Sequence, residues 1–253
     1  MSGYTPNIRT KKKVASALRK YARQMDDWVK PVDFTAKMRL GTANEFLLGV
    51  MLDRAILADK AWDSAEWICD SLGEPDAFWS NLVKMDRKAL KGFMRYGYGG
   101  KSFHRYYKTF AELLPLAAEH ILENYEGDPR RIWNSKRDVK AVRDELDAVP
   151  GIGQALANMA VLILARNYGL LGGKEALKEL DIKPDIQVRR VFERSGLVIR
   201  PASDQALIDA AKKLAPDFPA SLDAPAWEIG RTFCKPKVAD CDNCPLGEVC
   251  PRL

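Results

Sequence analysis

Apolar residues recur at helical spacing along most of the chain. In NEFLLGVMLDRAIL, residues 44–57, they follow a period of 3.6 and Asn44 stands where it can cap a helix. Four further stretches carry similar apolar stripes, and several end at a glycine, where a helix can stop in a left-handed turn: residues 63–73, 76–85, 86–97 and 103–127. Alternating strand patterns are few, so the pattern predicts an all-α fold.

Two further stripes flank the sequence PGIG. One stripe occupies residues 139–149 and the other residues 156–164, which predicts a helix, a tight turn and a second helix. Gly151 and Gly153 can adopt backbone angles that other residues avoid, and they leave amide hydrogens exposed at the start of the second helix. Such a turn can hold a DNA phosphate without reading sequence. The alternative is an ordinary helical hairpin with a glycine-rich turn.

A third amphipathic stretch, KPDIQVRRVFERSG, covers residues 183–196. Asp185 stands at its start and is a plausible N-cap. Val188, Val191 and Phe192 form the inward stripe. The three arginines lie largely off that stripe, and they could meet phosphate or solvent: Arg189, Arg190 and Arg194.

Composition adds limits to this helical picture. The chain has 253 residues, of which 47% are hydrophobic, so it can form one large domain or two modest ones with a substantial core. No run of eighteen apolar residues occurs, which excludes a transmembrane helix. The formal net charge of +6 favours a polyanionic partner, although a mildly basic soluble enzyme has the same balance.

Four of the five cysteines lie in the last twenty residues, at positions 234, 241, 244 and 250. The chain begins MSGYTPNIRTKKK without an apolar secretory segment, which predicts a cytoplasmic protein, nucleoid-associated if bacterial, and reduced thiols. Disulfides are therefore disfavoured. Four thiolates can hold a structural zinc ion, although only Cys241 and Cys244 form a C-x-x-C pair, or they can hold an iron–sulfur cluster, which tolerates uneven spacing. The spacing alone leaves these two metal centres open.

Together, VPGIGQALAN, an aspartate at the head of a later helix, and C-x6-C-x2-C-x5-C preceded by GRTF resemble the endonuclease III branch of base-excision DNA glycosylases. The resemblance extends to residues 44–62 and 96–110. It implies a [4Fe–4S] cluster held by the four cysteines Cys234, Cys241, Cys244 and Cys250.

The resemblance also implies an architecture. We expect two helical domains with the active site in the cleft between them. Residues 38–167 would form a helical barrel ending in the helix-hairpin-helix, while residues 1–37 and 168–253 would form the cluster domain. The expected partner is double-stranded DNA that contains a base lesion or mismatch, bound by a monomer with no membrane association.

By the same resemblance, the enzyme flips a nucleotide out of the duplex and breaks its N-glycosidic bond, and Asp185 is the catalytic aspartate. A carboxylate stabilises the positive charge that develops on the sugar. The residues expected to bind DNA are Arg54 and the hairpin residues Pro150, Gly151, Ile152, Gly153, Gln154 and Ala155.

The sequence departs from the family pattern at Ala155, where bifunctional members carry the lysine that forms a Schiff base. This departure predicts a monofunctional glycosylase. Two alternatives stay open. One is a non-catalytic or weakly active DNA-binding paralogue. The other is a bifunctional enzyme that uses another lysine, from the longer segment before Asp185: Lys174, Lys178 or Lys183. The family's usual glutamine of the inserting loop has no clear counterpart, since the chain offers Asp53, Arg54 and Ala55 instead. Arg54 could enter the gap left by a flipped base, or it could pair with Asp53 or a phosphate. Oxidised, mismatched and alkylated bases therefore stay open as substrates.

Overall fold

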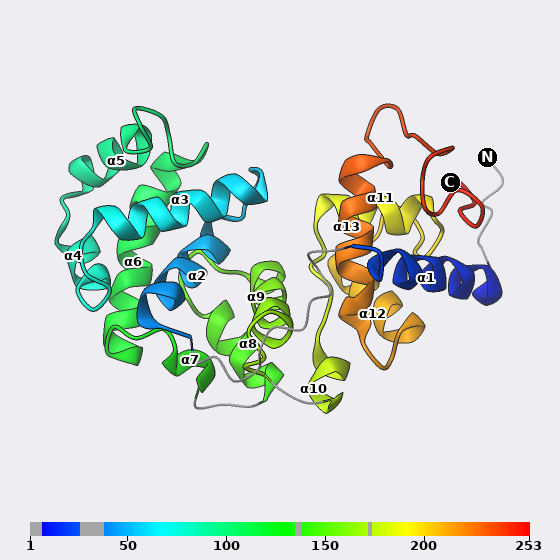
Figure 1. The fold of residues 1–253 in the computed structure, drawn as a ribbon, viewed down its shortest axis with the longest axis horizontal. Coiled ribbons are helices and arrows are strands. Elements are labelled where there is room, and N and C mark those ends of the chain that lie inside the picture. The colour runs from blue at the N-terminus through cyan, green and yellow to red at the C-terminus, as the bar shows by residue number, and fades with distance from the viewer. Residues whose placement is uncertain (1–6, 26–37, 135–137, 172–173) are drawn as a thin grey trace. The chain divides into compact units, whose positions relative to one another are not determined.

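A computed structural model describes residues 7–25, 38–134, 138–171 and 174–253. Within these ranges the chain forms thirteen α-helices and one 3-10 helix, with no strand (Figure 1). The predicted all-α fold is confirmed. No helix in the described part of the chain is long and apolar enough to cross a membrane.

The chain divides into two compact units. Residues 33–161 form one unit, and residues 1–32 together with 162–253 form the other. These limits are close to those expected for a barrel and a cluster domain, but the expected boundary near residue 37 lies outside the described residues. The assignment of the two domains therefore stays a prediction.

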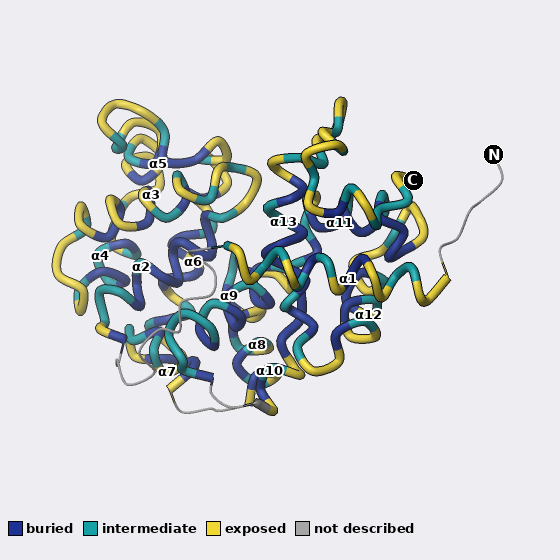
Figure 2. Tube along the Cα trace, turned by 45° about the vertical axis from the view of Figure 1, so that its right-hand side comes forward, coloured by how far each residue is buried: buried dark blue, intermediate teal, exposed yellow. Residues whose placement is uncertain are grey.

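The unit of residues 33–161 is built around α2, which is buried along most of its length (Figure 2). Phe46 of α2 packs edge-on against Trp133, with ring centroids 5.6 Å apart. The helices of this part are α2 (Leu40–Leu52), α3 (Ala58–Ser71), α4 (Phe78–Lys84), α5 (Arg87–Tyr96), α6 (Tyr107–Tyr125), α7 (Arg131–Asn134), α8 (Val139–Asp147) and α9 (Gln154–Arg166), whose last residues belong to the other unit.

The expected cap at Asn44 is wrong. Helix α2 begins at Leu40, so Asn44 lies inside it and is almost fully buried. Its side-chain amide donates to the carbonyl oxygen of Pro75 at 2.8 Å, and its side-chain oxygen accepts from Nε1 of Trp79 at 2.9 Å. A buried amide requires such partners, and both lie more than thirty residues away along the chain. Asn44 therefore ties α2 to α4 and to the segment before it.

The other unit joins the N-terminal helix to the C-terminal third of the chain. Helix α1 packs against α13 and the 3-10 helix, and the shared core includes Val14, Leu18, Phe192 and Ile229. The helices are α1 (Ile8–Ala22), α10 (Lys174–Glu179), α11 (Ile186–Arg194), α12 (Asp204–Leu214), the 3-10 helix (Pro219–Leu222) and α13 (Asp223–Thr232). The predicted inward stripe of α11 is confirmed, because Val188, Val191 and Phe192 are buried.

Candidate functional site

Asp185 caps the N-terminus of α11, as the sequence predicted. Its Oδ1 accepts hydrogen bonds from the backbone amides of Gln187 and Val188, at 2.8 and 2.9 Å. These two donors and the positive end of the helix dipole favour a charged carboxylate. The side chain is half-buried. The buried stripe of α11 fixes the rotation of the helix about its axis, so the carboxylate is held in one direction.

A second carboxylate, Asp223, lies close to Asp185 in the first turn of α13. It is only 8% exposed, and its Oδ2 accepts a hydrogen bond from the backbone amide of Lys183. Burial, and to a lesser extent the charge of Asp185, raise the pKa of Asp223 to about 7 against the lowering effects of Lys183 and Arg166. Burial also lowers the pKa of Arg166 to about 10. Asp223 stands in no motif that the sequence indicated, so its burial beside Asp185 was not predicted.

The lysines of the segment before Asp185 differ in their surroundings. Lys178 is exposed and forms an ion pair with Glu175 at 2.7 Å, as expected of a surface charge. Lys183 is half-buried, and its charge acts on Asp223. The side chain of Lys174 lies outside the described residues. Of the two lysines of this segment whose side chains are described, Lys183 is the one whose charge acts on Asp223.

The predicted hairpin is present between α8 and α9. Gly151 has a φ of +93°, which favours glycine. The first hydrogen bond of α9 runs from the amide of Ala157 to the carbonyl oxygen of Gly153, so the three preceding amides have no acceptor within the helix. Gly153 is exposed, and a Cβ built there would meet only open space. An outside group can therefore approach the backbone closely at Gly153.

The side chains of the hairpin do not all face solvent. Gly153 and Gln154 are exposed, whereas Pro150, Gly151 and Ala155 are half-buried. Ile152 is only 5% exposed and belongs to the core. The side chain of Ile152 is thus unsuited to direct contact with a ligand, and the groups that the turn can offer are mainly backbone amides.

Arg54 lies in the turn between α2 and α3 and is exposed. Its Nη2 donates to the carbonyl oxygen of Gly151 at 3.3 Å, which links this turn to the hairpin. The carbonyl oxygen of Arg54 lies 3.0 Å from Nε2 of the buried His104, and Nδ1 of His104 accepts from the amide of Tyr106 at 2.9 Å. Because Nδ1 is an acceptor, Nε2 must carry the proton and donate it. Burial lowers the pKa of His104, which suits this neutral form.

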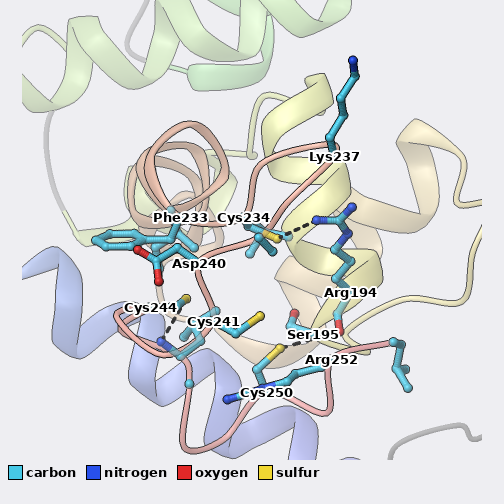
Figure 3. Close-up of a pocket in the computed structure, with 16 residues that line it drawn as sticks. Arg194, Ser195, Phe233, Cys234, Lys237, Asp240, Cys241, Cys244, Cys250 and Arg252 are labelled. Atoms are coloured by element: carbon cyan, nitrogen blue, oxygen red, sulfur yellow. Dashed lines mark hydrogen bonds between the residues drawn. The ribbon is translucent and has the colours of Figure 1, made fainter.

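The four cysteines of residues 234–250 line one cavity of about 250 Å³ (Figure 3). None of them is in a disulfide. The sulfur of Cys234 accepts from Nη1 of Arg194 at 3.7 Å, and the sulfur of Cys244 accepts from the amide of Leu246 at 3.5 Å. Gly247 lets the loop close tightly, since a Cβ there would lie 2.7 Å from the carbonyl oxygen of Cys241.

The arginines of α11 hold other parts of the protein. Arg190 donates through Nε to the carbonyl oxygen of Cys234 at 2.6 Å, and Arg194 donates to that of Lys235 at 2.7 Å. Arg189 forms an ion pair with Asp204. The three guanidinium groups thus have intramolecular partners, whereas the sequence suggested phosphate or solvent as their partners. Arg190 and Arg194 fix the start of the cysteine loop.

No protein-family model matches the chain. A curated relative, the candidate DNA repair glycosylase MJ1434 of Methanocaldococcus jannaschii, is 24% identical over 217 residues, which cover 83% of this chain and 86% of the relative.

Solved structures decide the fold. A trapped endonuclease III–DNA covalent intermediate with an estranged adenine has a TM-score of 0.68 at 19% identity, and 96% of each chain is covered. The chain has the endonuclease III fold. A non-covalent endonuclease III–DNA complex aligns with a TM-score of 0.67 at 19% identity over 96% of this chain and 95% of that one. A thermostable thymine-DNA glycosylase aligns with a TM-score of 0.62 at 16% identity over 96% of each chain. The resemblance inferred from the sequence is thereby confirmed.

Within the endonuclease III fold, the cysteine cavity fits a metal cluster by its size and its donors. Among the described residues, no three His, Cys, Asp or Glu side chains are close enough to hold a single ion. The four thiols instead line a larger cavity, whose lining also includes Arg194, Arg252 and the acidic Asp240. A polynuclear cluster needs more room than one zinc ion, and it takes four thiolate ligands. The donor set and the space therefore fit an iron–sulfur cluster.

Proposed function

We propose that this chain is a base-excision DNA glycosylase, which extrudes a damaged or mismatched base from double-stranded DNA and hydrolyses its N-glycosidic bond. The observation that carries the proposal is the carboxylate of Asp185, half-buried and held by two amides at the head of α11, in a chain with the endonuclease III fold. The names of the relatives, a DNA repair glycosylase and a thymine-DNA glycosylase, support the same activity.

Asp185 supplies the negative charge in this reaction. As the glycosidic bond breaks, positive charge develops on the deoxyribose, and a nearby carboxylate stabilises it more strongly in the transition state than in the ground state. The amides of Gln187 and Val188 hold Oδ1, so the charge does not need to reorient during the reaction. Water then attacks the sugar, because Ala155 offers no amine at the family lysine position.

The hairpin and Arg54 hold the DNA backbone in this proposal. The amides that precede the first hydrogen bond of α9 bind a phosphate, and the open space at Gly153 lets the phosphate approach. Arg54 is exposed beside the hairpin and adds a cation that can contact a phosphate or the gap left by the flipped base.

The four cysteines of the loop would hold a [4Fe–4S] cluster. When bound, the cluster would cross-link the loop and add local charge, without taking part in bond cleavage. Burial raises the pKa of the thiols of Cys244 and Cys250, so binding metal to them requires the loss of protons. We further propose a monomeric protein in the cytoplasm, nucleoid-associated if bacterial.

Two alternatives rest on particular residues. Lys183 is half-buried and interacts with Asp223, so it is a candidate amine for a bifunctional enzyme. The replacement of the family lysine by Ala155 is also compatible with a DNA-binding paralogue that lacks turnover. The half-buried, capped Asp185 favours a catalyst over such a paralogue.

The test is single-turnover base release from duplexes that each carry an oxidised, mismatched or alkylated base, followed by alkali to cleave abasic sites. Asp185→Asn keeps a helix cap but removes the charge, so we expect release to fall about 100-fold or more, with duplex affinity unchanged. Asp209→Asn, at an exposed acid of α12, is the matched control. Duplex binding without release on every substrate would favour the paralogue.

Borohydride trapping distinguishes a monofunctional glycosylase from a bifunctional enzyme that uses a lysine. A monofunctional enzyme forms no imine, so abasic DNA should give no covalent adduct. Adducts that persist in Lys178→Ala but vanish in Lys183→Ala would instead establish the bifunctional alternative. Lys178 is the matched control because it is exposed and paired with Glu175.

A further inference from the structure

The segment that leads into Asp185 is held in place by side chains and backbone of its own unit. The amide of Ala220 donates to the carbonyl oxygen of Leu180 at 3.0 Å, and Lys212 of α12 pairs with the buried Asp181 at 3.0 Å. The last of these attachments before Asp185 is the hydrogen bond from the amide of Lys183 to Asp223. It acts on the main chain only two residues before the carboxylate.

Asp223 is itself firmly placed. It begins α13, and that helix packs closely on α11: a Cβ at Gly230 would lie 2.8 Å from Cβ of Gln187. The side chain of Asp223 is almost fully buried, so its rotamer is restricted by packing. The Oδ2 atom of Asp223, which is held on α13, thus fixes the position of the main chain at Lys183, just before α11 begins.

We propose that Asp223 is a positioning residue for Asp185: through the amide of Lys183 it sets the direction in which the chain enters α11, and therefore the direction of the Asp185 carboxylate. This proposal rests on the proposed glycosylase function. It assigns Asp223 no contact with DNA.

The charged groups around Asp223 are consistent with a role as acceptor in either protonation state. Arg166 of α9 and Lys183 lower its pKa, whereas burial and the charge of Asp185 raise it to about 7. A protonated carboxyl group keeps a carbonyl oxygen that can accept from an amide. The positioning contact thus survives protonation, and an amide side chain can replace it.

The experiment compares two substitutions of similar size. Asp223→Asn keeps an oxygen acceptor, and Asp223→Leu removes it while filling the space. We expect single-turnover base release to fall between about 10- and 100-fold in Asp223→Leu and to return close to the wild-type rate in Asp223→Asn. Asp209→Leu is the control for an acid-to-leucine change on the exposed face of α12, and its rate should stay at the wild-type value.

A second measurement does not depend on catalysis. Hydrogen exchange of the Gln187 and Val188 amides, which the Asp185 cap protects, should be faster in Asp223→Leu and unchanged in Asp223→Asn. If the wild type releases no base, the proposed function fails, while the exchange data still test the positioning role.

Three outcomes would overturn the inference. One is wild-type rate and exchange in Asp223→Leu. Another is equal impairment of a folded Asp223→Asn, which would assign the effect to the charge and not to the hydrogen bond. If Asp223→Leu does not fold, Asp223→Asn decides, and slowed release or faster exchange in that folded variant would refute the positioning role.

Discussion

The hairpin turn of residues 150–153 and the cysteine loop of residues 234–250 offer different kinds of chemical group to a ligand. At the hairpin, the exposed groups are backbone amides, and a side chain added at Gly153 would point into open space. At the cysteine loop, the groups are four sulfur atoms around a cavity, and the main chain is held from outside by Arg190 and Arg194.

The contrast teaches how each region responds to substitution. A site made of backbone amides depends on the open space at Gly153, so adding atoms there damages it. A site made of thiols depends on each side chain, because every lost sulfur removes one ligand. Variants can therefore be chosen to damage one region and leave the other intact.

The largest effect is expected for the cysteine loop. The purified protein should contain about four irons per chain, and Cys250→Ser should lose most of them because one thiolate ligand is missing. Loss of a metal centre belongs to the few changes that lower the free energy of unfolding by about 4 kcal/mol or more. Metal analysis and chemical denaturation measure the two quantities.

Cys69→Ala is the matched control for the cysteine loop. Cys69 is buried in α3, and burial raises the pKa of its thiol, so it behaves as a small core residue. The variant should lose some stability through its cavity but keep its iron. One zinc per chain with no iron in the wild type would contradict the cluster assignment.

An intermediate effect is expected at the hairpin, where two glycines separate fold from binding. Gly153→Val should leave the free energy of unfolding almost unchanged, since its Cβ meets open space, but should weaken binding to every duplex alike, by about tenfold or 1.4 kcal/mol. Gel-shift or anisotropy titrations at two salt concentrations measure this, because phosphate contacts release counterions.

Gly151→Ala provides the reverse case. Its φ of +93° is strained for alanine, and the new Cβ would lie 3.2 Å from Cε of Met51, so stability should fall by about 1–3 kcal/mol. The hairpin assignment loses its basis if Gly153→Val binds duplex like the wild type, or if its loss is confined to one lesion.

The smallest effect on stability is expected at His104, which bonds the carbonyl oxygen of Arg54 beside the hairpin. Its folded pKa is lowered below the usual 6.5 mainly by burial, so the unfolded chain binds the proton more readily. The stabilisation is complete above pH of about 6.5 and is lost as the pH falls through the lowered folded pKa, by about 1.4 kcal/mol for each unit of lowering. Urea denaturation across this range should show it.

His104→Gln, which does not titrate, should give a flatter stability profile over the same range, because the proton uptake is absent. A profile for the variant parallel to that of the wild type would assign the acid dependence to another group. The Cys69→Ala variant retains His104 and the four loop cysteines and should keep the wild-type slope.

Contacts that are local in sequence could be predicted, and distant ones could not. The cap at Asp185 followed from a proline, an aspartate and an apolar stripe within a few residues. The predicted cap at Asn44 was wrong because asparagine suits both a helix cap and a buried hydrogen-bond network. Its partners, Pro75 and Trp79, are brought to it by tertiary packing. His104 bonds a carbonyl group fifty residues away and Asp223 an amide forty residues away, so neither contact leaves a local pattern.

The candidate site was predictable to a similar degree. The thiols were visible as residue types, whereas the attachment of their loop to Arg190 and Arg194 was not, because guanidinium groups off an apolar stripe suit solvent, phosphate and carbonyl oxygens equally. The hairpin turn could be located from its glycines. That Ile152 within it is a core residue depended on the packing beneath the turn.

Helix α11 carries Asp185 before its first residue and the loop-holding Arg190 and Arg194 in its later turns. An α-helix turns about 100° per residue, so one residue inserted between Gln187 and Arg190 would rotate the arginines by that angle relative to the carboxylate. The helix could then keep either the orientation of the Asp185 carboxylate or the hydrogen bonds of Arg190 and Arg194 to the cysteine loop, but not both. Its length is therefore fixed to the residue, and we expect α11 to tolerate substitutions on its exposed face but no insertion or deletion.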